Sequence, residues 1–331
     1  MKALRVGFMI VVLAVGGWAQ GLTVVDQAGR TVEIAAVPTR VASAFAVATA
    51  YVYALGAGDL VVGARYLGIP DSPIARGVMA RIDPQWEGKG FPGDVTVEAI
   101  VALKADLVVA GVRHQKLADL LGDVGIPTVL YAAETFDAVR AATELTGKIL
   151  GREEAAARLV ALFDEVVAEV ASAVPADEEA PRVLFVGTEP LRVAAAGMYQ
   201  AQQIALAGGR TAAEDLAGTS WQNVSPEQFL LWNPDVIVIA SYGTAVPVDY
   251  LGDPVFQGIT AVQTGRVYKM PQLLFAWDNP IPESVLGIAW LAELLHPGSL
   301  PLPLGEYAAR LYRDFYEVEL TAEELASIIG P

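Results

Sequence analysis

Several short loops that follow apolar, strand-like segments carry cationic and aromatic side chains. In the first half of the chain they are Phe45, Arg65, Tyr66, Phe91, Arg113 and His114, beside Ser43 and Ala44. In the second half they are Arg192, Tyr199, Trp221, Tyr242, Trp277 and Asp278, beside Thr188, Met198 and Ser241. Guanidinium groups pair with carboxylates and oxyanions, while aromatic faces pack against apolar groups. This set predicts non-covalent capture of a bulky, partly apolar anion.

The patterns that support catalysis are missing. The chain has no cysteine, no H-E-x-x-H and no Walker loop, and "GTSWQ" at residues 218–222 departs from G-x-S-x-G at its last position. The "GAGD" at residues 56–59 lacks the third glycine of a dinucleotide fingerprint. We therefore expect a protein that is not an enzyme and has no cofactor; the remote alternative is a secreted α/β enzyme with a site built from distant residues.

Metal ligation by the protein itself is also restricted. His114 and His296 are the only histidines, so a bare zinc or manganese site built from several histidines is excluded. His114 or Tyr66 could still act as an axial donor to a metal that arrives inside a ligand.

The elements that must position these loops include a sequence pattern that occurs twice in the chain. "TVEAIVALKADLVVAG" at residues 96–111 and "SPEQFLLWNPDVIVIAS" at residues 225–241 each begin with a good N-cap, Thr96 or Ser225. Glu98 and Glu227 fall in the first helical turn that follows. Each stretch then ends in an apolar run without polar alternation, which is typical of a strand buried on both faces of a parallel sheet.

Similar strand-like runs alternate with helical patterns along the whole chain. They are "RVASAF", "LVVGA", "DLVVAG" and "PTVLYA" in the first half, and "RVLFVG", "DVIVIAS" and "RVYKMPQ" in the second. This alternation predicts an α/β protein with two Rossmann-like lobes and parallel-rich sheets. Ligands of such sheets bind at the carboxyl ends of the strands, so the loops above should face a cleft between the lobes.

A helical pattern without proline before Pro175 separates the two halves. Residues 136–175 are rich in Ala, Leu and Glu, and predict one long backbone helix with a break at Gly151. We expect an N-terminal lobe at residues 20–135 and a C-terminal lobe at residues 176–331, joined by this helix.

The first nineteen residues have the pattern of a secretory signal. Lys2 and Arg5 precede an apolar centre, and Gly17 and Ala19 flank Trp18, so we expect cleavage after Ala19. An uncleaved anchor is the weaker alternative because the apolar run is barely long enough to span a bilayer. Without cysteine there is no lipidation site, so we expect a protein free in the periplasm. The formal net charge of -16 argues against nucleic-acid binding.

The order of these segments resembles one group of binding proteins. The "P-x-R-V" start at Pro38, Arg40 and Val41, "VEAIVALKADLVVAG", "GIPTVLYAAETFDAV", "AGGRTAAEDL" and "AVQTGRVYKMP" are similar to segments of the substrate-binding proteins of ABC importers for iron complexes, haem and cobalamin. The resemblance covers the mature chain, although Ala105 stands where the family usually has proline.

The resemblance implies capture of a metal chelate between the lobes and its delivery to a permease dimer by a monomeric protein. It also implies that Glu98 and Glu227 dock into arginine pockets on that permease, although a glutamate in a first helical turn also stabilises its own helix. Phe91 stands where haem-binding members carry a ligating tyrosine, which makes haem the weakest ligand. A ferric siderophore or similar iron complex, with Fe3+ part of the ligand, comes first, then molybdate or tungstate, then a corrinoid.

Overall fold

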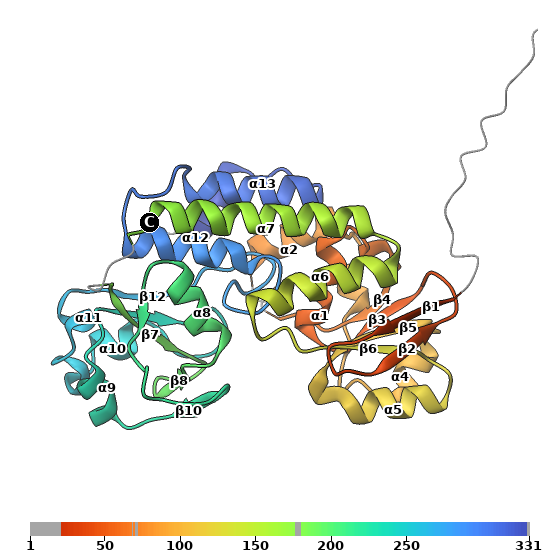
Figure 1. The fold of residues 1–331 in the computed structure, drawn as a ribbon, viewed down its shortest axis with the longest axis horizontal. Coiled ribbons are helices and arrows are strands. Elements are labelled where there is room, and N and C mark those ends of the chain that lie inside the picture. Colours follow the sequence, from red (N-terminus) through yellow and green to blue (C-terminus); the bar gives the residue numbers. More distant parts are fainter. Residues whose placement is uncertain (1–20, 68, 70–71, 176–179, 330–331) are drawn as a thin grey trace, which may run out of the picture.

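The computed structural model describes residues 21–329, apart from residues 68, 70–71 and 176–179. Figure 1 shows two lobes side by side beneath a layer of long helices. The signal segment expected at residues 1–19 lies outside the described residues.

The N-terminal lobe is built on a four-stranded parallel sheet with the strand order β4-β3-β5-β6. Its strands are β3 (Val41–Ser43), β4 (Val61–Ala64), β5 (Leu107–Gly111) and β6 (Thr128–Tyr131), and a hairpin of β1 (Leu22–Val25) and β2 (Thr31–Ile34) precedes them. The helices are α1 (Ala46–Ala54), α2 (Pro73–Ile82), α3 (Trp86–Lys89), α4 (Val97–Ala102) and α5 (Gln115–Asp123). Every residue of β5 is buried, as its apolar run predicts.

The C-terminal lobe has a six-stranded mixed sheet with the order β10-β8-β7-β11-β12, and β9 also pairs with β7. Its strands are β7 (Arg182–Val186), β8 (Arg192–Ala194), β9 (Arg210–Thr211), β10 (Trp221–Asn223), β11 (Val236–Ile239) and β12 (Val267–Lys269). The helices are α8 (Tyr199–Leu206), α9 (Pro226–Trp232), α10 (Val248–Leu251) and α11 (Thr260–Gln263). The predicted α/β fold with parallel-rich sheets is confirmed, while the antiparallel pair β8–β10 was not predicted.

The connecting segment is two helices rather than one. Helix α6 (Phe136–Leu150) ends where Gly151 adopts the left-handed conformation with φ of 65°, and α7 (Glu153–Ala173) starts again after Arg152. Only glycine adopts this φ without strain, so the break predicted at Gly151 reverses the chain. The helix that runs across both lobes is therefore α7 alone, and α6 packs beside it (Figure 1).

The chain's last helices complete the layer that covers both lobes. They are α12 (Ser284–Leu295), α13 (Leu304–Tyr316) and α14 (Ala322–Ile329). Arg310 of α13 pairs with Glu165 of α7 at 2.7 Å, and Glu324 of α14 pairs with Arg81 of α2 at 2.6 Å. The segment from residue 176 onward is thus not confined to one lobe, because its end returns over the N-terminal lobe.

The two repeated stretches form equivalent elements in the two lobes. The side chain of Thr96 accepts a hydrogen bond from the Ala99 N–H at the start of α4, and that of Ser225 accepts one from the Gln228 N–H at the start of α9. Both predicted N-caps are therefore confirmed. In Figure 1, α4 and α9 lie on the side of the molecule opposite α7 and α13.

Candidate ligand-binding cleft

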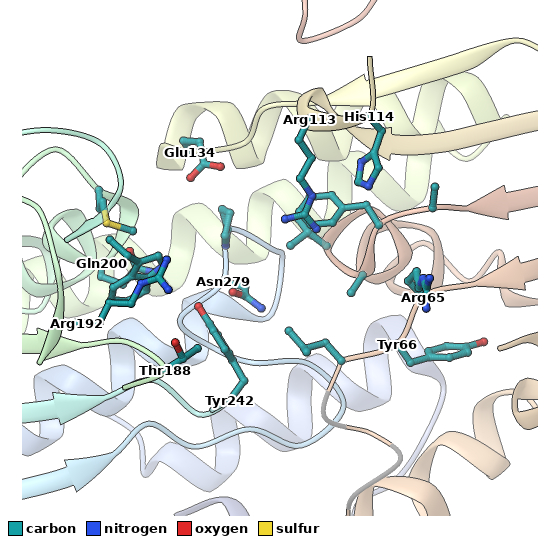
Figure 2. Close-up of a pocket in the computed structure, with 18 residues that line it drawn as sticks. Arg65, Tyr66, Arg113, His114, Glu134, Thr188, Arg192, Gln200, Tyr242 and Asn279 are labelled. Atoms are coloured by element: carbon teal, nitrogen blue, oxygen red, sulfur yellow. The ribbon is translucent and has the colours of Figure 1, made fainter. Parts of the chain in front are cut away.

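A cleft of about 610 Å³ lies between the lobes and is lined by both. On the N-terminal side, residues that follow parallel strands line it: Ala44, Phe45, Arg65, Tyr66, Arg113 and His114. From the C-terminal lobe it receives Thr188, Arg192, Met198, Trp221 and Tyr242. All of these were expected from the strand-end rule, and Figure 2 shows them converging from two sides.

Phe45 forms the centre of the N-terminal wall. It lies between β3 and α1, and the guanidinium carbon of Arg113 sits 4.3 Å from the centre of its ring. The His114 ring packs on it as well, with 5.8 Å between ring centres. Gly111 lies directly behind, since a Cβ there would come within 2.8 Å of the Phe45 ring. The N-terminal wall thus presents the Phe45 ring with the Arg113 guanidinium stacked on its face.

Arg65 and His114, the other basic side chains of this wall, differ in how they are held. The Arg65 guanidinium donates to the Gly93 carbonyl, which fixes it at the mouth of the cleft. His114 keeps its Nδ1 within 3.2 Å of the Gly111 carbonyl. Desolvation and the nearby Arg113 charge lower the pKa of His114, so it is neutral at pH 7. Positive charge in this wall therefore comes from the arginines.

The C-terminal wall has the same chemistry in a different arrangement. Trp221, at the start of β10, lies flat over Gly187, where a Cβ would approach the indole ring to 2.8 Å. Arg192 opens the neighbouring strand β8. The Tyr242 hydroxyl stays protonated because burial and the nearby Asp278 carboxylate raise its pKa well above 10.

Two helices begin at the cleft, one from each lobe. Helix α1 starts after Phe45 and α8 starts after Met198, and neither N-cap residue forms a side-chain cap hydrogen bond. By contrast, Ser or Thr side chains cap α2, α4, α6 and α9. In α8 the Ala201 N–H already donates to the Met198 carbonyl at 3.1 Å, so the groups left for an anion in the cleft are the N–H groups of Tyr199 and Gln200 and those of the first turn of α1.

Six of the predicted residues do not line the cleft, namely Ser43 and Ser241, which are buried, and the four described next. Trp277 and Asp278 are fully buried, because α12 packs over their loop at Gly287 and Asp278 instead accepts a hydrogen bond from Ser241. Tyr199 is buried as well: its ring stacks on Phe136 and its hydroxyl bonds to Ser284. Phe91 turns toward β4 and packs against Gly63. Burial raises the pKa of Asp278 to about 6.

Tyr66 lines the cleft with its ring but not with its hydroxyl. That hydroxyl lies 2.9 Å from the Tyr53 hydroxyl, which donates to Asp83 at 2.7 Å, and Lys89 pairs with the same carboxylate. Figure 2 shows the Tyr66 oxygen pointing away from the cleft. The expectation that Tyr66 could serve as an axial metal donor is wrong in this arrangement, which leaves His114 as the candidate. No cluster of three or more metal-binding side chains occurs in the part of the chain that the structure describes.

The structure adds polar residues that sequence reasoning missed. Glu134, Gln200 and Asn279 line the cleft, together with Ala46, Val47, Leu67 and Pro280. Glu134 follows β6, so the strand-end rule could have found it. Gln200 sits in the first turn of α8, and Asn279 comes from the loop that Tyr51 of α1 holds by a hydrogen bond to the Pro280 carbonyl at 2.8 Å.

Residues 41–274, which include most residues that line the cleft and the sheets of both lobes, match the family model described as periplasmic binding protein. The chain belongs to the periplasmic binding protein family. This periplasmic binding protein is thus a substrate-binding component of ABC transport, a class that binds small solutes and works with a permease. Within the described residues, no helix has the length and apolar character needed to cross a membrane.

Known relatives of this periplasmic binding protein are named for different ligands. It is 27% identical to the molybdate-binding protein MolA of Haemophilus influenzae, over 73% of this chain and 78% of MolA. It is 29% identical to the cobalamin-binding protein of Halobacterium salinarum, over 82% of this chain and 73% of that one. A solved periplasmic solute-binding protein of Veillonella parvula is 28% identical with a TM-score of 0.78, over 93% of this chain and 97% of that one.

Proposed function

We propose that this protein captures an anionic metal chelate in the cleft, a ferric siderophore or similar iron complex, and delivers it to a permease. The observation that carries this proposal is the placement of three guanidinium groups, Arg65, Arg113 and Arg192, around aromatic faces from both lobes. Ferric ions bound by carboxylate or catecholate chelators form complexes with a negatively charged rim and apolar parts. Such a complex matches arginines for its rim and aromatic rings for its body.

The size of the cleft supports a chelate over a small ion. Clefts of about 300–1,000 Å³ enclose small organic ligands, and this one has about 610 Å³. A tetrahedral oxyanion would fill only a small part of this space. Within the described residues no cluster of metal-binding side chains lines the cleft, so we expect the cleft to recognise the chelator rather than the metal.

Molybdate or tungstate is the second candidate function. It is favoured by the uncapped N-termini of α1 and α8, whose N–H groups can bind an oxyanion, and by the similarity to MolA. A corrinoid comes next, on the similarity to the cobalamin-binding relative. Haem comes last, since Tyr66 is already hydrogen-bonded to Tyr53.

We also infer that the protein docks on a permease dimer through Glu98 and Glu227. Both side chains are exposed in the first turn of their helices, and those helices, α4 and α9, lie on one side of the molecule (Figure 1). Each has an exposed apolar side chain about one turn further along: Val101 in α4 and Leu231 in α9, which is 75% exposed. Acidic and apolar groups matched in two lobes suit one broad partner with arginines in its surface. We further propose that residues 1–19 are a cleaved signal and that the protein acts as a periplasmic monomer.

The test is a tryptophan-fluorescence titration of residues 20–331. The panel contains ferric citrate, ferric hydroxamate and catecholate complexes, haem, cobalamin, molybdate and tungstate. We expect saturable quenching by a ferric chelate, and loss of that signal in Trp221→Phe with binding retained by calorimetry. A response to molybdate or tungstate alone would replace the chelate by the second candidate. No response to any member, by fluorescence or calorimetry, would overturn the proposal.

A further inference from the structure

Glu134 places a carboxylate in a cleft that otherwise attracts anions. It follows β6 and precedes Thr135, the N-cap of α6, and it lines the cleft together with Arg113 and Arg192. Figure 2 shows its side chain between Arg113 and Gln200, with the carboxylate turned toward the interior. Glu134 is exposed to solvent in the cleft, and within the described residues its carboxylate has neither a hydrogen-bond donor nor an ion-pair partner, so a ligand that displaces the solvent there must replace its hydrogen bonds. Desolvation by the cleft raises the pKa of Glu134, while Arg113 lowers it in part.

A second acceptor without a donor lines the same cleft. Gln200 is only 3% exposed, and its Nε2 donates to the Asp278 carbonyl at 2.8 Å. Because a carbonyl can only accept, this bond fixes which end of the amide is the oxygen. The Gln200 Oε1 atom has no hydrogen-bond partner among the described residues. Buried acceptors are nearly always paired, so we treat the Gln200 oxygen as a second acceptor beside Glu134, which a ligand donor would satisfy directly or through a water.

The two kinds of polar group together restrict the ligand. Arg65, Arg113 and Arg192 offer donors and positive charge, whereas Glu134 and Gln200 offer acceptors. Bare molybdate is fully deprotonated near neutral pH and carries acceptors alone. It would satisfy the arginines, leave both acceptors without a donor and be repelled by the Glu134 charge. A chelator that has N–H or O–H groups beside its carboxylates would satisfy both sets.

We propose that Glu134 is a specificity residue that selects chelates carrying a hydrogen-bond donor or a positive charge beside their anionic groups. The inference rests on the proposed function of the cleft and narrows its ligand class. It assigns opposite tasks to neighbouring side chains: the arginines bind the anionic rim, and Glu134 with Gln200 binds the donors. An anion that lacks donors is then disfavoured although it suits the arginines.

Stabilisation of α6 does not account for a carboxylate at residue 134. Thr135 already caps that helix through its hydroxyl, which accepts from the Ala138 N–H at 3.1 Å. Asp137 supplies the acidic side chain of the first turn and pairs with Arg140 at 3.6 Å, away from the cleft. Asp137→Asn is therefore the matched control for removal of one negative charge at the same helix end.

The experiment measures calorimetric affinities of wild type, Glu134→Gln, Glu134→Met and Asp137→Asn for three probes. Ferric aerobactin carries carboxylates and amide N–H groups, ferric citrate lacks amides, and molybdate has acceptors only. We expect the preference of the wild type for ferric aerobactin over molybdate to fall about tenfold or more in Glu134→Met. Glu134→Gln keeps an acceptor oxygen, so its preference for ferric aerobactin over molybdate should lie between those of the wild type and Glu134→Met. Asp137→Asn should match the wild type.

The outcomes separate this inference from the proposed function. Equal changes for all probes in the Glu134 variants, or the same shift in Asp137→Asn, would overturn the inference and leave chelate capture standing. Wild-type binding of molybdate alone would overturn the inference in favour of the oxyanion function. Binding of no probe at all would overturn the chelate proposal and this inference with it.

Discussion

The guanidinium carbon of Arg113 lies 4.3 Å from the centre of the Phe45 ring, so the cation in the N-terminal wall rests on an aromatic face. Stacking of this kind contributes about 0.5–2 kcal/mol, more where water is excluded. Gly111 has no side chain, so the Phe45 ring packs directly against the backbone there. The ring held in this way limits how far the Arg113 guanidinium can move. Arg113 is thereby positioned before a ligand arrives.

We therefore expect Phe45→Leu to weaken binding of the anionic ligand roughly fivefold, because the arginine loses its aromatic support while the apolar volume remains. Arg113→Met should weaken it more, since it removes the charge itself. A double-mutant cycle of the two substitutions, read by calorimetry, should show that their effects are not additive. Additive effects would mean that Phe45 contacts the ligand independently of Arg113.

Gly187 controls the position of Trp221. A Cβ at residue 187 would approach the indole ring to 2.8 Å, which is closer than side-chain atoms tolerate. We expect Gly187→Ala to push the indole into the cleft, shift its emission and reduce ligand affinity about tenfold or more. Fluorescence spectra and titration of the same preparation check both effects.

Gly122→Ala is the control for this substitution. Gly122 lies in α5 with nothing within 4 Å of an added Cβ, so alanine there should leave binding unchanged and slightly favour the helix. If Gly187→Ala binds as tightly as Gly122→Ala, Trp221 has no part in ligand contact.

Local pattern predicted the lobes well and the cleft in part. The fully apolar runs at β5 and β11 and the N-caps Thr96 and Ser225 each depend on a few neighbouring residues, which the sequence displays directly. The strand-end rule found Arg65, because a residue that directly follows a parallel strand is held at the sheet edge.

The misses come from packing between segments far apart in the chain. Trp277 lies in the loop eight residues beyond the end of β12, where α12 covers it and Gln203 bonds its carbonyl at 2.7 Å, neither of which is visible locally. Gln200 reaches the cleft only because α8 points at it. The break at Gly151 was predicted, but whether the chain would continue or reverse there depends on how α6 packs against α7.

Glu283 provides a prediction on pH and stability. It is fully buried at the start of α12 and accepts hydrogen bonds from Tyr312 at 3.0 Å and Tyr316 at 2.6 Å. Burial raises its pKa from 4.5 to about 7, although the two tyrosines lower it in part. The folded state thus holds the proton more tightly than the unfolded state, so this group's contribution to stability is full below pH 4.5 and is lost as pH rises through about 7.

We expect the free energy of unfolding of the wild type, relative to Glu283→Gln, to fall by on the order of 3 kcal/mol from pH 4.5 to above pH 7. Urea titrations at several pH values measure this difference, and the exposed Glu306→Gln in α13 should show none of it. A difference that rises with pH would mean that the tyrosine hydrogen bonds outweigh burial and keep Glu283 ionised.

The docking proposal predicts that substitution of Glu98 or Glu227 reduces transport but leaves ligand binding unchanged. Hydrogen bonds at the helix N-termini, from the Glu98 backbone and Thr96 in one lobe and from Ser225 in the other, lower the pKa of Glu98 and of Glu227, so both carry a full charge at pH 7. Glu98→Gln and Glu227→Gln keep the size of each side chain and remove the charge that a permease arginine would bind. Each should leave calorimetric ligand affinity within about twofold and reduce uptake by cells that carry the cognate permease at least tenfold.

Two further variants show what the docking surface recognises. Glu154→Gln, an exposed acid in the first turn of α7 on the opposite side of the molecule, should leave uptake unchanged. Leu231→Ser should reduce uptake without changing ligand affinity, because it removes apolar area from the C-terminal docking surface and leaves Glu227 in place. Lost ligand affinity in either glutamate variant would place that residue in folding or in the cleft, whereas unchanged uptake in both would mean that the two glutamates serve only their own helices.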